Sequence, residues 1–550
     1  MHRALLLPDG RLIALSIARE NGQQTMQARY SFDNGEHWSE PENLFLWPKE
    51  AGGFGLFEAL VDKDGEIHIW SLCDGNSGIL YRNPKGKAVR PGMVLDIWHV
   101  RSNNRRNAWT QPKAIWTGHG SDLLSAIQLH NGRLVLPYSF NNGERWESPT
   151  SGFHAFSYSG PYRVSVLYSD DNGDSWHQSP DVLSVQTPDL STYGADEPVV
   201  IQLKNGRVWM LIRTQRGRFY ESFSDDGSRW STAEPTQLYS SDSPAGLLRL
   251  KDGSILLISN ACLRYPYAYG ARNVLHGAIS SDEGETWRGF RELVRDPARD
   301  DPPDRKGDYG ISYSFPTLTK DGKVLFSNWV ESGRSRTFRL FDPSWLLETK
   351  QSTDFSNGID EWSVFGSKGV SLAPDPSKSS SKALAIRKLD AQWPAAAVWN
   401  FPVGAKGRLH LEIMLRDGFG GALIGLTDHF SVPWDLEDRI YNAISLPINS
   451  DGNILSDAKL AAGRWHSLLL EWDAGKGHCR ISVDGKPAGV LGMNRRVRGI
   501  NYLRIRSVAN RPDSGLLIRS VSADVTDSWS VNSAAAVLSG QSNHATRVEK

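Results

Sequence analysis

The chain has 550 residues, too many for one ordinary domain, and its 62 Lys and Arg balance its 62 Asp and Glu to a net charge of zero. This balance argues against a nucleic-acid-binding protein, which would show a basic excess. Three cysteines far apart in sequence exclude a disulfide scaffold and a multi-cysteine metal site. No apolar run approaches the roughly 18 residues that a membrane-spanning helix needs.

Six hairpin signals follow one another along the first 350 residues. Each consists of an apolar run, then Asp-Gly or Asn-Gly, then a second apolar run. The turns lie at Asp9, Asp64, Asn131, Asn205, Asp252 and Asp321. Asp-Gly and Asn-Gly supply the positive φ angles that two-residue hairpin turns require. Spacings of roughly 45 to 75 residues between the turns predict six four-stranded units, that is, a six-bladed β-propeller.

A second repeat, Ser-x-Asp-x-Gly-x-x-Trp, is out of phase with the hairpins. Three full copies, a shorter one and a degraded one begin at Ser31, Ser169, Ser280, Ser224 and Ser102. In such a turn the Asp side chain can bond backbone N–H groups, while Gly takes the left-handed conformation and Trp packs the turn onto its sheet. We therefore interpret the repeat as a folding element and not as a catalytic one.

Together the hairpins and the second repeat resemble the sialidases (neuraminidases), in which the Asp-box, or BNR repeat, accompanies a six-bladed propeller. The resemblance covers about residues 1–348. It implies an exo-acting glycoside hydrolase that releases a terminal acidic sugar, sialic acid or a related one. Because this sugar carries a carboxylate at its anomeric carbon, its recognition requires planar, bidentate arginines. The resemblance further implies a tyrosine nucleophile activated by a glutamate.

Four positions match the spacing of that family. The resemblance makes Tyr313 the nucleophile, Glu197 its activating base, and Arg213 and Arg272 the ligands of the carboxylate. Glu197 and Tyr313 each stand eight residues before the Asn or Asp of their own hairpin turn. Because equivalent positions in radially repeated blades face the same mouth of the central channel, these two side chains are expected to converge.

The remainder of the family pattern is altered. No Arg-Ile-Pro motif opens the chain, and Arg3 is the nearest substitute for the first arginine of the family. The family's general acid is an Asp about a dozen residues before the first box, where this chain offers Glu20 instead. Glu331 resembles the glutamate that braces the first arginine, shifted by two residues. A solvated loop position is the alternative interpretation of Glu20.

The segment before the third hairpin adds His119 and Asp122. A His–Asp pair can act as an acid/base unit, although such residues are more often loop caps. We count both among the candidate substrate-binding residues. If they are catalytic, the enzyme is not an ordinary sialidase.

From residue 351 to about 527 the boxes and paired hairpins vanish, and strand-like runs follow. The run GRWHSLLLEWDAGKGHCRISVDG resembles laminin-G-like or concanavalin-like jelly rolls, which implies a β-sandwich. Trp434, Trp465 and Trp472 are expected to pack in its core sooner than to stack on sugars. Residues 528–550 are small and polar and are expected to be a disordered tail.

The sequence thus predicts an all-β protein with a six-bladed propeller at residues 1–350 and a β-sandwich at 351–527. We expect a glycan substrate, no cofactor, no metal, no nucleic acid and no membrane span, and an extracellular or periplasmic location. Two alternatives stay open: a propeller glycosidase or lyase acting on a rhamnoside or uronate, and a non-catalytic glycan-binding protein. If either Arg213 or Arg272 is tied wholly to structural carboxylates, a neutral sugar is favoured over sialic acid.

Overall fold

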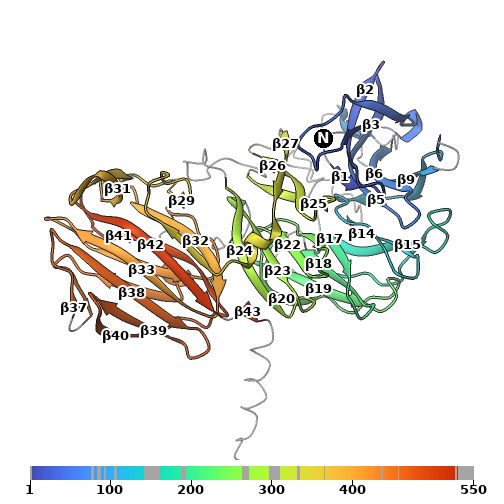
Figure 1. Ribbon diagram of the computed structural model, residues 1–550. Helices are drawn as coiled ribbons and strands as arrows, with labels where there is room; N and C mark the ends of the chain where they lie inside the picture. Colours follow the sequence, from blue (N-terminus) through green and yellow to red (C-terminus); the bar gives the residue numbers. More distant parts are fainter. Residues whose placement is uncertain are drawn as a thin grey trace, which may run out of the picture. The chain divides into compact units, whose positions relative to one another are not determined.

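The computed structural model describes residues 3–51, 53–75, 80–82, 88–91, 94–103, 108–141, 162–186, 194–262, 272–295, 310–330, 335–364, 366–434, 438–455, 458–526 and 529–530. Strands make up almost all of its regular structure (Figure 1). Contacts between Cα atoms divide the chain into two compact units. The first comprises Met1–Asn260, Tyr267–Arg272 and Asp308–Pro343, and the second comprises Ala261–Pro266, Asn273–Gly307 and Ser344–Lys550. The predicted boundaries after residues 350 and 527 stay predictions.

The six hairpin signals open six successive groups of antiparallel strands. The first group is β1 (Arg3–Leu6), β2 (Leu12–Glu20), β3 (Gln23–Ser31) and β4 (Glu42–Leu46), followed by the short helix η1 (Lys49–Ala51). The second is β5 (Gly53–Val61), β6 (Ile67–Gly75), β9 (Val94–Asn103), β10 (Ala108–Trp109) and β11 (Lys113–Trp116), with the small hairpin β7 (Leu80–Arg82) and β8 (Ala88–Pro91). The third is β12 (His119–Gly120), β13 (Ile127–Gln128), β14 (Leu134–Asn141), β15 (Arg163–Ser169) and β16 (His177–Gln178).

The fourth group is β17 (Asp196–Gln202), β18 (Val208–Arg213), β19 (Arg218–Ser224) and β20 (Glu234–Tyr239). The fifth comprises the hairpin β21 (Gly246–Arg249) and β22 (Ile255–Ser259) in the first unit, and the hairpin β23 (Val274–Ser280) and β24 (Thr286–Arg295) in the second. The sixth is β25 (Ser312–Leu318), β26 (Val324–Val330) and β27 (Ser335–Phe341). The second and third groups are joined into one ten-stranded sheet by β12, which pairs with both β9 and β14.

The innermost strands of the first unit lie side by side in a ring. Strand β1 contacts β5 and β25, β17 contacts β13 and β21, and β21 contacts β25. Because β25 belongs to the last group and β1 to the first, this contact closes the ring. The predicted six-bladed β-propeller is confirmed.

The hairpin turns depend on glycine. The second residue of every Asp-Gly or Asn-Gly pair has a positive φ, from 80° at Gly65 to 94° at Gly132. The preceding Asp or Asn does not, which differs from the prediction of two-residue turns. In the first hairpin the backbone of Leu7 is paired with that of Arg11. The loop between them therefore has three residues, a length at which glycine alone takes the left-handed conformation.

The second repeat forms the compact turns that the sequence predicted. In the first copy the Ser31 hydroxyl donates to Asp33 at 2.8 Å and accepts from the backbone N–H of Gly35 at 2.8 Å. The indole N–H of Trp38 donates to the carbonyl of Gly35 at 3.1 Å. The copies that begin at Ser169 and Ser280 repeat these bonds. The repeat is a folding element, as interpreted from its sequence.

The second unit contains a β-sandwich, which confirms the predicted second fold. Its larger sheet runs β30 (Val370–Asp375), β31 (Lys378–Ile386), β42 (Leu516–Thr526), β33 (Lys406–Leu415), β38 (Trp465–Asp473), β39 (His478–Val483) and β40 (Lys486–Gly492), with β28 (Lys350–Thr353) beside β42. Its smaller sheet runs β29 (Trp362–Ser363), β32 (Ala396–Gly404), β41 (Ile500–Ser507), β34 (Ala422–Thr427) and β35 (Ile444–Ile448). One buried apolar cluster draws on both sheets, including Trp399, Leu411 and Ile424.

The short elements after β27 include η3 (Pro343–Leu347), α1 (Asp438–Tyr441), β36 (Asn453–Leu455), β37 (Ala458–Lys459) and β43 (Trp529–Ser530). Strand β43 lies at the start of the segment predicted as a tail. It pairs with Thr286 and Trp287 of β24, and the Trp529 ring packs against Phe290 at 5.6 Å between centroids. A large aromatic ring that can be buried therefore orders this part of the polar segment.

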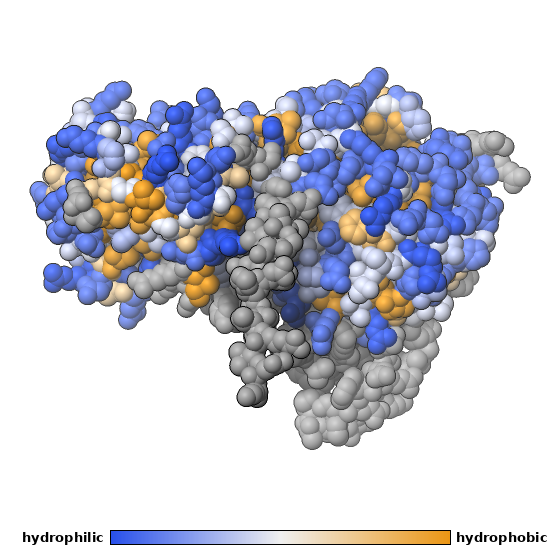
Figure 2. Space-filling view, turned by 90° about the horizontal axis from the view of Figure 1, so that it is seen from below, coloured by the Kyte–Doolittle hydropathy of each residue, from blue (hydrophilic) through white to orange (hydrophobic). Residues whose placement is uncertain are grey.

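The surface mixes polar and apolar side chains in the view of Figure 2. The most exposed large apolar residues, such as Phe32, Val490 and Leu46, are scattered along the chain. Within the described ranges, no helix is both long and apolar enough to cross a membrane.

Candidate active site

Glu197 and Tyr313 occupy equivalent and strained positions on two innermost strands. Glu197 is the second residue of β17 and Tyr313 the second residue of β25. At each position the strand register shifts, between Asp196 and Val199 in β17 and between Ser312 and Phe315 in β25. Their φ angles are 43° and 56°, in the left-handed region that side chains other than glycine rarely adopt. The bulges therefore turn both side chains away from the regular pleat.

The two side chains meet in a buried hydrogen-bonded group. The Tyr313 hydroxyl donates to Glu197 Oε1 at 2.7 Å. Arg213 Nη1 donates both to Glu197 Oε2 and, at 3.0 Å, to the Tyr313 oxygen. All three residues are less than a tenth exposed. Hydrogen bonds thus join three of the four residues that the family spacing selected.

The electrostatics of this group suit a base beside a phenol. Burial raises the pKa of Glu197 to about 8, against the opposing effect of Arg213. Burial and then the charge of Glu197 hold the pKa of Tyr313 well above its usual value, while Arg213 and Arg272 lower it. A base with a pKa near neutrality is suited to accept a proton in turnover. Arg213 is placed to stabilise the phenolate that would result.

The raised pKa of Glu197 makes the stability of the folded protein depend on pH. In the unfolded chain this carboxyl ionises above about 4.5, but in the folded protein it keeps its proton up to about 8. Since the folded state then binds more protons, the free energy of unfolding falls as pH rises through this window, by up to about 1.4 kcal/mol per pH unit. Glu197→Gln should remove this loss, so its melting temperature should fall less than that of the wild type between pH 5 and pH 8.

Calorimetric melting across that range measures the difference. Glu234→Gln, at an exposed position of β20, is the control and should follow the wild type. Parallel curves for the wild type and Glu197→Gln would contradict a raised pKa at Glu197.

Asp242 anchors both arginines and was not singled out from the sequence. Its Oδ1 accepts from Arg213 Nε and Nη2, each at 2.7 Å. Its backbone carbonyl accepts from Arg272 Nε at 3.0 Å and Nη2 at 2.6 Å. Burial opposes the charge on Arg213, yet Asp242 and Glu197 hold the pKa of its guanidinium well above its usual value. The hydrogen bonds described for Arg213 therefore join it to Asp242, Glu197 and Tyr313.

Arg272 reaches the same tyrosine from another side. Its guanidinium carbon lies 5.2 Å from the centroid of the Tyr313 ring, and the residue is 2% exposed. Since its anchor is a neutral carbonyl and not a carboxylate, its charge is less compensated by that anchor than the charge of Arg213 is by Asp242.

Arg3 and Glu58 form a second buried pair around the channel. Each stands six residues before the Asp of its hairpin turn, Arg3 on β1 and Glu58 on β5, and their side chains form an ion pair. Glu58 thus braces Arg3, whereas the sequence suggested Glu331 for that role. Glu331 lies outside the described residues.

A fourth arginine completes the group and was also missed. Arg336 on β27 donates to the backbone carbonyl of Tyr313 at 3.0 Å. Arg3 and Arg336 lie 4.3 and 4.6 Å from the centroid of the Phe315 ring. Burial, followed by repulsion from Arg336, lowers the pKa of Arg3 to about 9, and burial lowers that of Arg336 to about 10. These two cations are therefore poised to gain from a bound anion.

A cavity of about 380 Å³ lies within the ring of innermost strands. Arg3 and Glu58 line it, together with residues of β13, β17, β21 and β25 such as Gln128, Val199 and Leu248. Of the charged residues described above, Arg3 and Glu58 thus line this cavity, whereas Glu197, Arg213 and Tyr313 are not among its lining residues.

The other predicted site residues are placed as follows. Asp122 lies between β12 and β13, and its charge adds to the effect of burial in raising the pKa of Glu197 and Tyr313. His119 lies on β12, which joins two sheets, and its ring packs 6.5 Å from that of Tyr162. Glu20, at the exposed end of β2, accepts from Asn43 Nδ2 at 2.7 Å. The charge of Asp122 therefore acts on the group, whereas the contacts described for Glu20 and His119 are with Asn43 and Tyr162.

One set of described residues has the ligand spacing of a metal site, Asp33 with Glu36 and His37. It belongs to the first box, where Asp33 already accepts from the Ser31 hydroxyl and from the backbone N–H of His37. The turn itself accounts for this arrangement.

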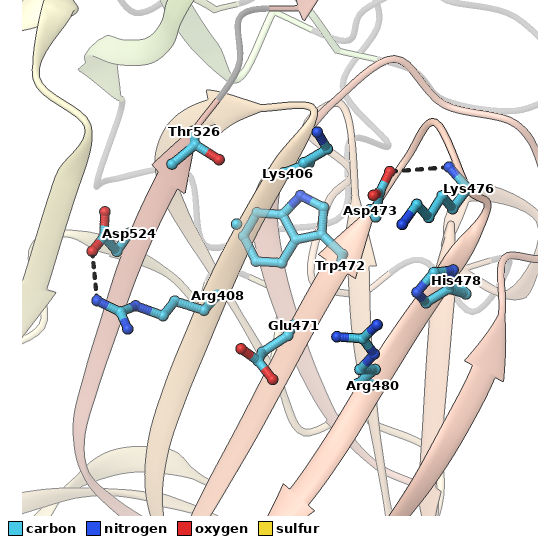
Figure 3. Close-up of a pocket in the computed structure, with 11 residues that line it drawn as sticks. Lys406, Arg408, Glu471, Trp472, Asp473, Lys476, His478, Arg480, Asp524 and Thr526 are labelled. Atoms are coloured by element: carbon cyan, nitrogen blue, oxygen red, sulfur yellow. Dashed lines mark hydrogen bonds and ion pairs between the residues drawn. The ribbon is translucent and has the colours of Figure 1, made fainter.

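A second hollow, of about 370 Å³, lies on the larger sheet of the sandwich over β33, β38, β39 and β42 (Figure 3). Charged side chains of both signs surround it, and Arg408 pairs with Asp524 at 2.9 Å. The indole of Trp472 is 3% exposed and donates to the carbonyl of Gly404 at 3.0 Å. This tryptophan packs in the core, as expected, and offers no stacking surface to a sugar.

Residues 62–326 match the family model described as the BNR repeat-like domain. Among solved structures, the chain is similar to Trypanosoma rangeli sialidase, with 14% identity, 95% of this chain and 92% of that chain covered, and a TM-score of 0.41. The same enzyme in complex with sialic acid matches with 14% identity, coverages of 95% and 91%, and a TM-score of 0.39. A Dyadobacter fermentans protein of unknown function matches with 17% identity, coverages of 61% and 92%, and a TM-score of 0.41.

At these identities the likeness to solved structures concerns the fold alone. The family match spans the boxes from Ser102 to Ser280 and five of the six hairpin turns. The match of residues 62–326 to the BNR repeat-like domain agrees with the Asp-box repeat that the sequence predicted.

Proposed function

We propose that this protein is an exo-acting glycoside hydrolase of the sialidase type that releases a terminal acidic sugar. The observation that carries the proposal is the bond of 2.7 Å between the Tyr313 hydroxyl and Glu197, with Arg213 on the same phenol oxygen. A buried tyrosine that shares a base and a cation has the components of an activated nucleophile. The strained backbone at Tyr313 and Glu197 adds to this, since such strain clusters at functional sites.

In the proposed reaction, Tyr313 Oη forms a bond to the anomeric carbon as its proton passes to Glu197. The glycosidic C–O bond breaks, and the leaving oxygen takes a proton from an acid. Water then attacks the anomeric carbon, the bond to Tyr313 breaks, and Glu197 returns its proton to the phenol. The attacking water gives a proton to the deprotonated acid and thereby restores it.

We assign the acid to Asp122 in preference to Glu20. The charge of Asp122 acts on both members of the Tyr313–Glu197 pair, whereas Glu20 is exposed and bonded to Asn43. For the carboxylate of the sugar we favour Arg272, Arg336 and Arg3, because Arg213 is engaged by Asp242 and Glu197. The repulsion between Arg3 and Arg336, which a bound carboxylate would relieve, supports this choice.

Product analysis tests the proposal. The purified chain is incubated with an aryl sialoside and with a panel of plant and algal glycans, and released monosaccharides are identified. Release of sialic acid or a related acidic sugar is the expected result. Release of neutral sugars alone, or of unsaturated products, would replace the proposal by the second candidate.

That second candidate is a propeller enzyme that acts on another glycan, such as a rhamnoside. One observation favours it: the described donors of Arg213 go to Asp242, Glu197 and Tyr313, so this arginine is tied to protein groups. A neutral substrate would not need Arg213 as a carboxylate ligand.

Arg272 discriminates between the two candidates. If the substrate is anionic, Arg272→Ala should lose a charge-assisted bond of about 1.5–3 kcal/mol, which lowers kcat/KM by about 10- to 150-fold. Arg272→Lys should restore little, because a point charge does not reproduce the planar fork. Steady-state kinetics give the ratio. Arg133→Ala is the control, since Arg133, next to β14, bonds to Asp170 and to the carbonyl of Asp226. Equal losses in the Arg272 and Arg133 variants would contradict an anionic substrate.

A further inference from the structure

Asp242 is a buried and heavily engaged carboxylate of the propeller that the proposed reaction does not use. It lies in the buried segment 240–245 between β20 and β21 and is 1% exposed. Its Oδ1 accepts two bonds from Arg213, its Oδ2 accepts from Gln215 Nε2 at 2.8 Å, and its carbonyl accepts two from Arg272. Five donor nitrogens therefore converge on one residue, and they come from Arg213, Gln215 and Arg272.

The direction of these bonds fixes how Arg213 is used. Because Nε and Nη2 are turned to Asp242, the remaining edge with Nη1 faces Glu197 and Tyr313. A guanidinium presents its donors in a rigid plane, so fixing one edge fixes the other. The carboxylate of Asp242 also balances the charge on Arg213, which would otherwise act in full on Glu197.

We propose that Asp242 is a positioning residue. It holds Arg213 against the Tyr313–Glu197 pair and away from the substrate, and it maintains Glu197 as a base. The assignment to a reacting pair rests on the proposed function. The neutralisation of Arg213 by Asp242 does not, and it is measurable without any substrate.

The sign of the effect follows from the charges around Glu197. Those that face it are Arg213 on β18, Asp196 on β17, Asp122 before β13 and the phenol of Tyr313 on β25. Of these, Arg213 is the cation. The carboxylate that balances its charge most strongly is Asp242. Asp242→Asn keeps the shape of the side chain but removes that balance. The free charge on Arg213 then favours ionised Glu197 and lowers its pKa.

The first readout is the pH dependence of kcat/KM on the substrate found in product analysis. In Asp242→Asn the acidic limb should move to lower pH by about one unit or more, the size of shift that one nearby charge produces. The plateau should fall, because Glu197 is then a weaker base. The control is Asp428→Asn in the sandwich, where a buried carboxylate pairs with Arg495. That variant should lose stability without moving the limb.

The second readout needs no turnover. The melting temperature is measured at pH 5 and pH 8 for four proteins: the wild type, Glu197→Gln, Asp242→Asn and the double variant. Between pH 5 and pH 8, a protein with Glu197 should lose more melting temperature than its Glu197→Gln counterpart. This difference should be smaller when Asp242 is replaced by Asn. An unchanged difference overturns the proposal. If the wild type hydrolyses no glycan but the difference shrinks, the proposed function fails and the role of Asp242 stands.

A gentler variant covers the case in which Asp242→Asn does not fold. Gln215 is half-buried and donates to Asp242 Oδ2. Gln215→Lys places a cation on that oxygen and so weakens the balance of Arg213 without altering Asp242. Both readouts should shift in the same direction as for Asp242→Asn, by a smaller amount. A shift in the opposite direction, or none in either variant, overturns the proposal.

Discussion

Tyr313→Phe is expected to reduce turnover of an aryl sialoside by at least about a thousand-fold, because it removes the oxygen proposed as the nucleophile. The ring and its contact with Arg272 remain, so the melting temperature should change by only a few degrees. Glu197 loses a donor and Arg213 an acceptor, but each keeps its bond to the other. Stopped assays with high enzyme concentrations measure the residual rate.

Tyr138→Phe is the matched control, because Tyr138 on β14 is also a buried tyrosine of the propeller. It should retain full turnover. If Tyr313→Phe were as active as this control, Tyr313 would have no part in the reaction, and the second candidate function would need another nucleophile.

Removal of residues 352–550 is expected to abolish soluble expression. The hairpin β23–β24 belongs to the same compact unit as the sandwich. His276 Nε2 lies 2.6 Å from the Tyr502 oxygen, and the Tyr502 hydroxyl donates to Glu292 at 2.6 Å. Asn400 and Asn501 both donate to the carbonyl of Phe290. Truncation leaves these buried groups without partners, at about 1–3 kcal/mol each, a sum comparable with the whole stability of a domain.

A chain that ends at Ser530 keeps all of these contacts and is the control for the truncation. Tyr502→Phe is a graded version, since it removes only the hydroxyl between His276 and Glu292. It should lower the free energy of unfolding by about 1–3 kcal/mol while the protein stays soluble. A soluble, cooperatively folding chain of residues 1–351 would show that β23–β24 does not need the sandwich.

The parts of the fold that the sequence predicts are those set by local chemistry. Asp-Gly and Asn-Gly mark the hairpins because few residues tolerate a positive φ. The Ser-x-Asp-x-Gly-x-x-Trp turns are predictable because their hydrogen bonds join residues within one short segment. The convergence of Glu197 and Tyr313 was predictable because both are counted from such a turn. The same count of residues would have found Glu58, which stands six before Asp64 as Arg3 stands six before Asp9.

Asp242 and Arg336 had no such signal. Asp242 lies in an irregular segment between two strands, where no repeat fixes its distance from a turn. Arg336 lies on β27, where it pairs with Trp329 of β26, and its meeting with Phe315 depends on how the sheet twists. The place of β43 beside β24 joins residues more than 240 positions apart, and local patterns do not encode a pairing over such a distance.

The left-handed backbone at Glu197 and Tyr313 has a consequence for how the sequence evolves. A side chain in this conformation costs roughly 1–2 kcal/mol, a cost that glycine does not bear. Selection for stability alone therefore favours glycine at both positions, whereas selection for the proposed chemistry would favour Glu197 and Tyr313. Among homologues that have lost activity but kept the propeller, these two positions are where glycine would accumulate first. Their replacement would then mark a lineage that retains the scaffold without the reaction.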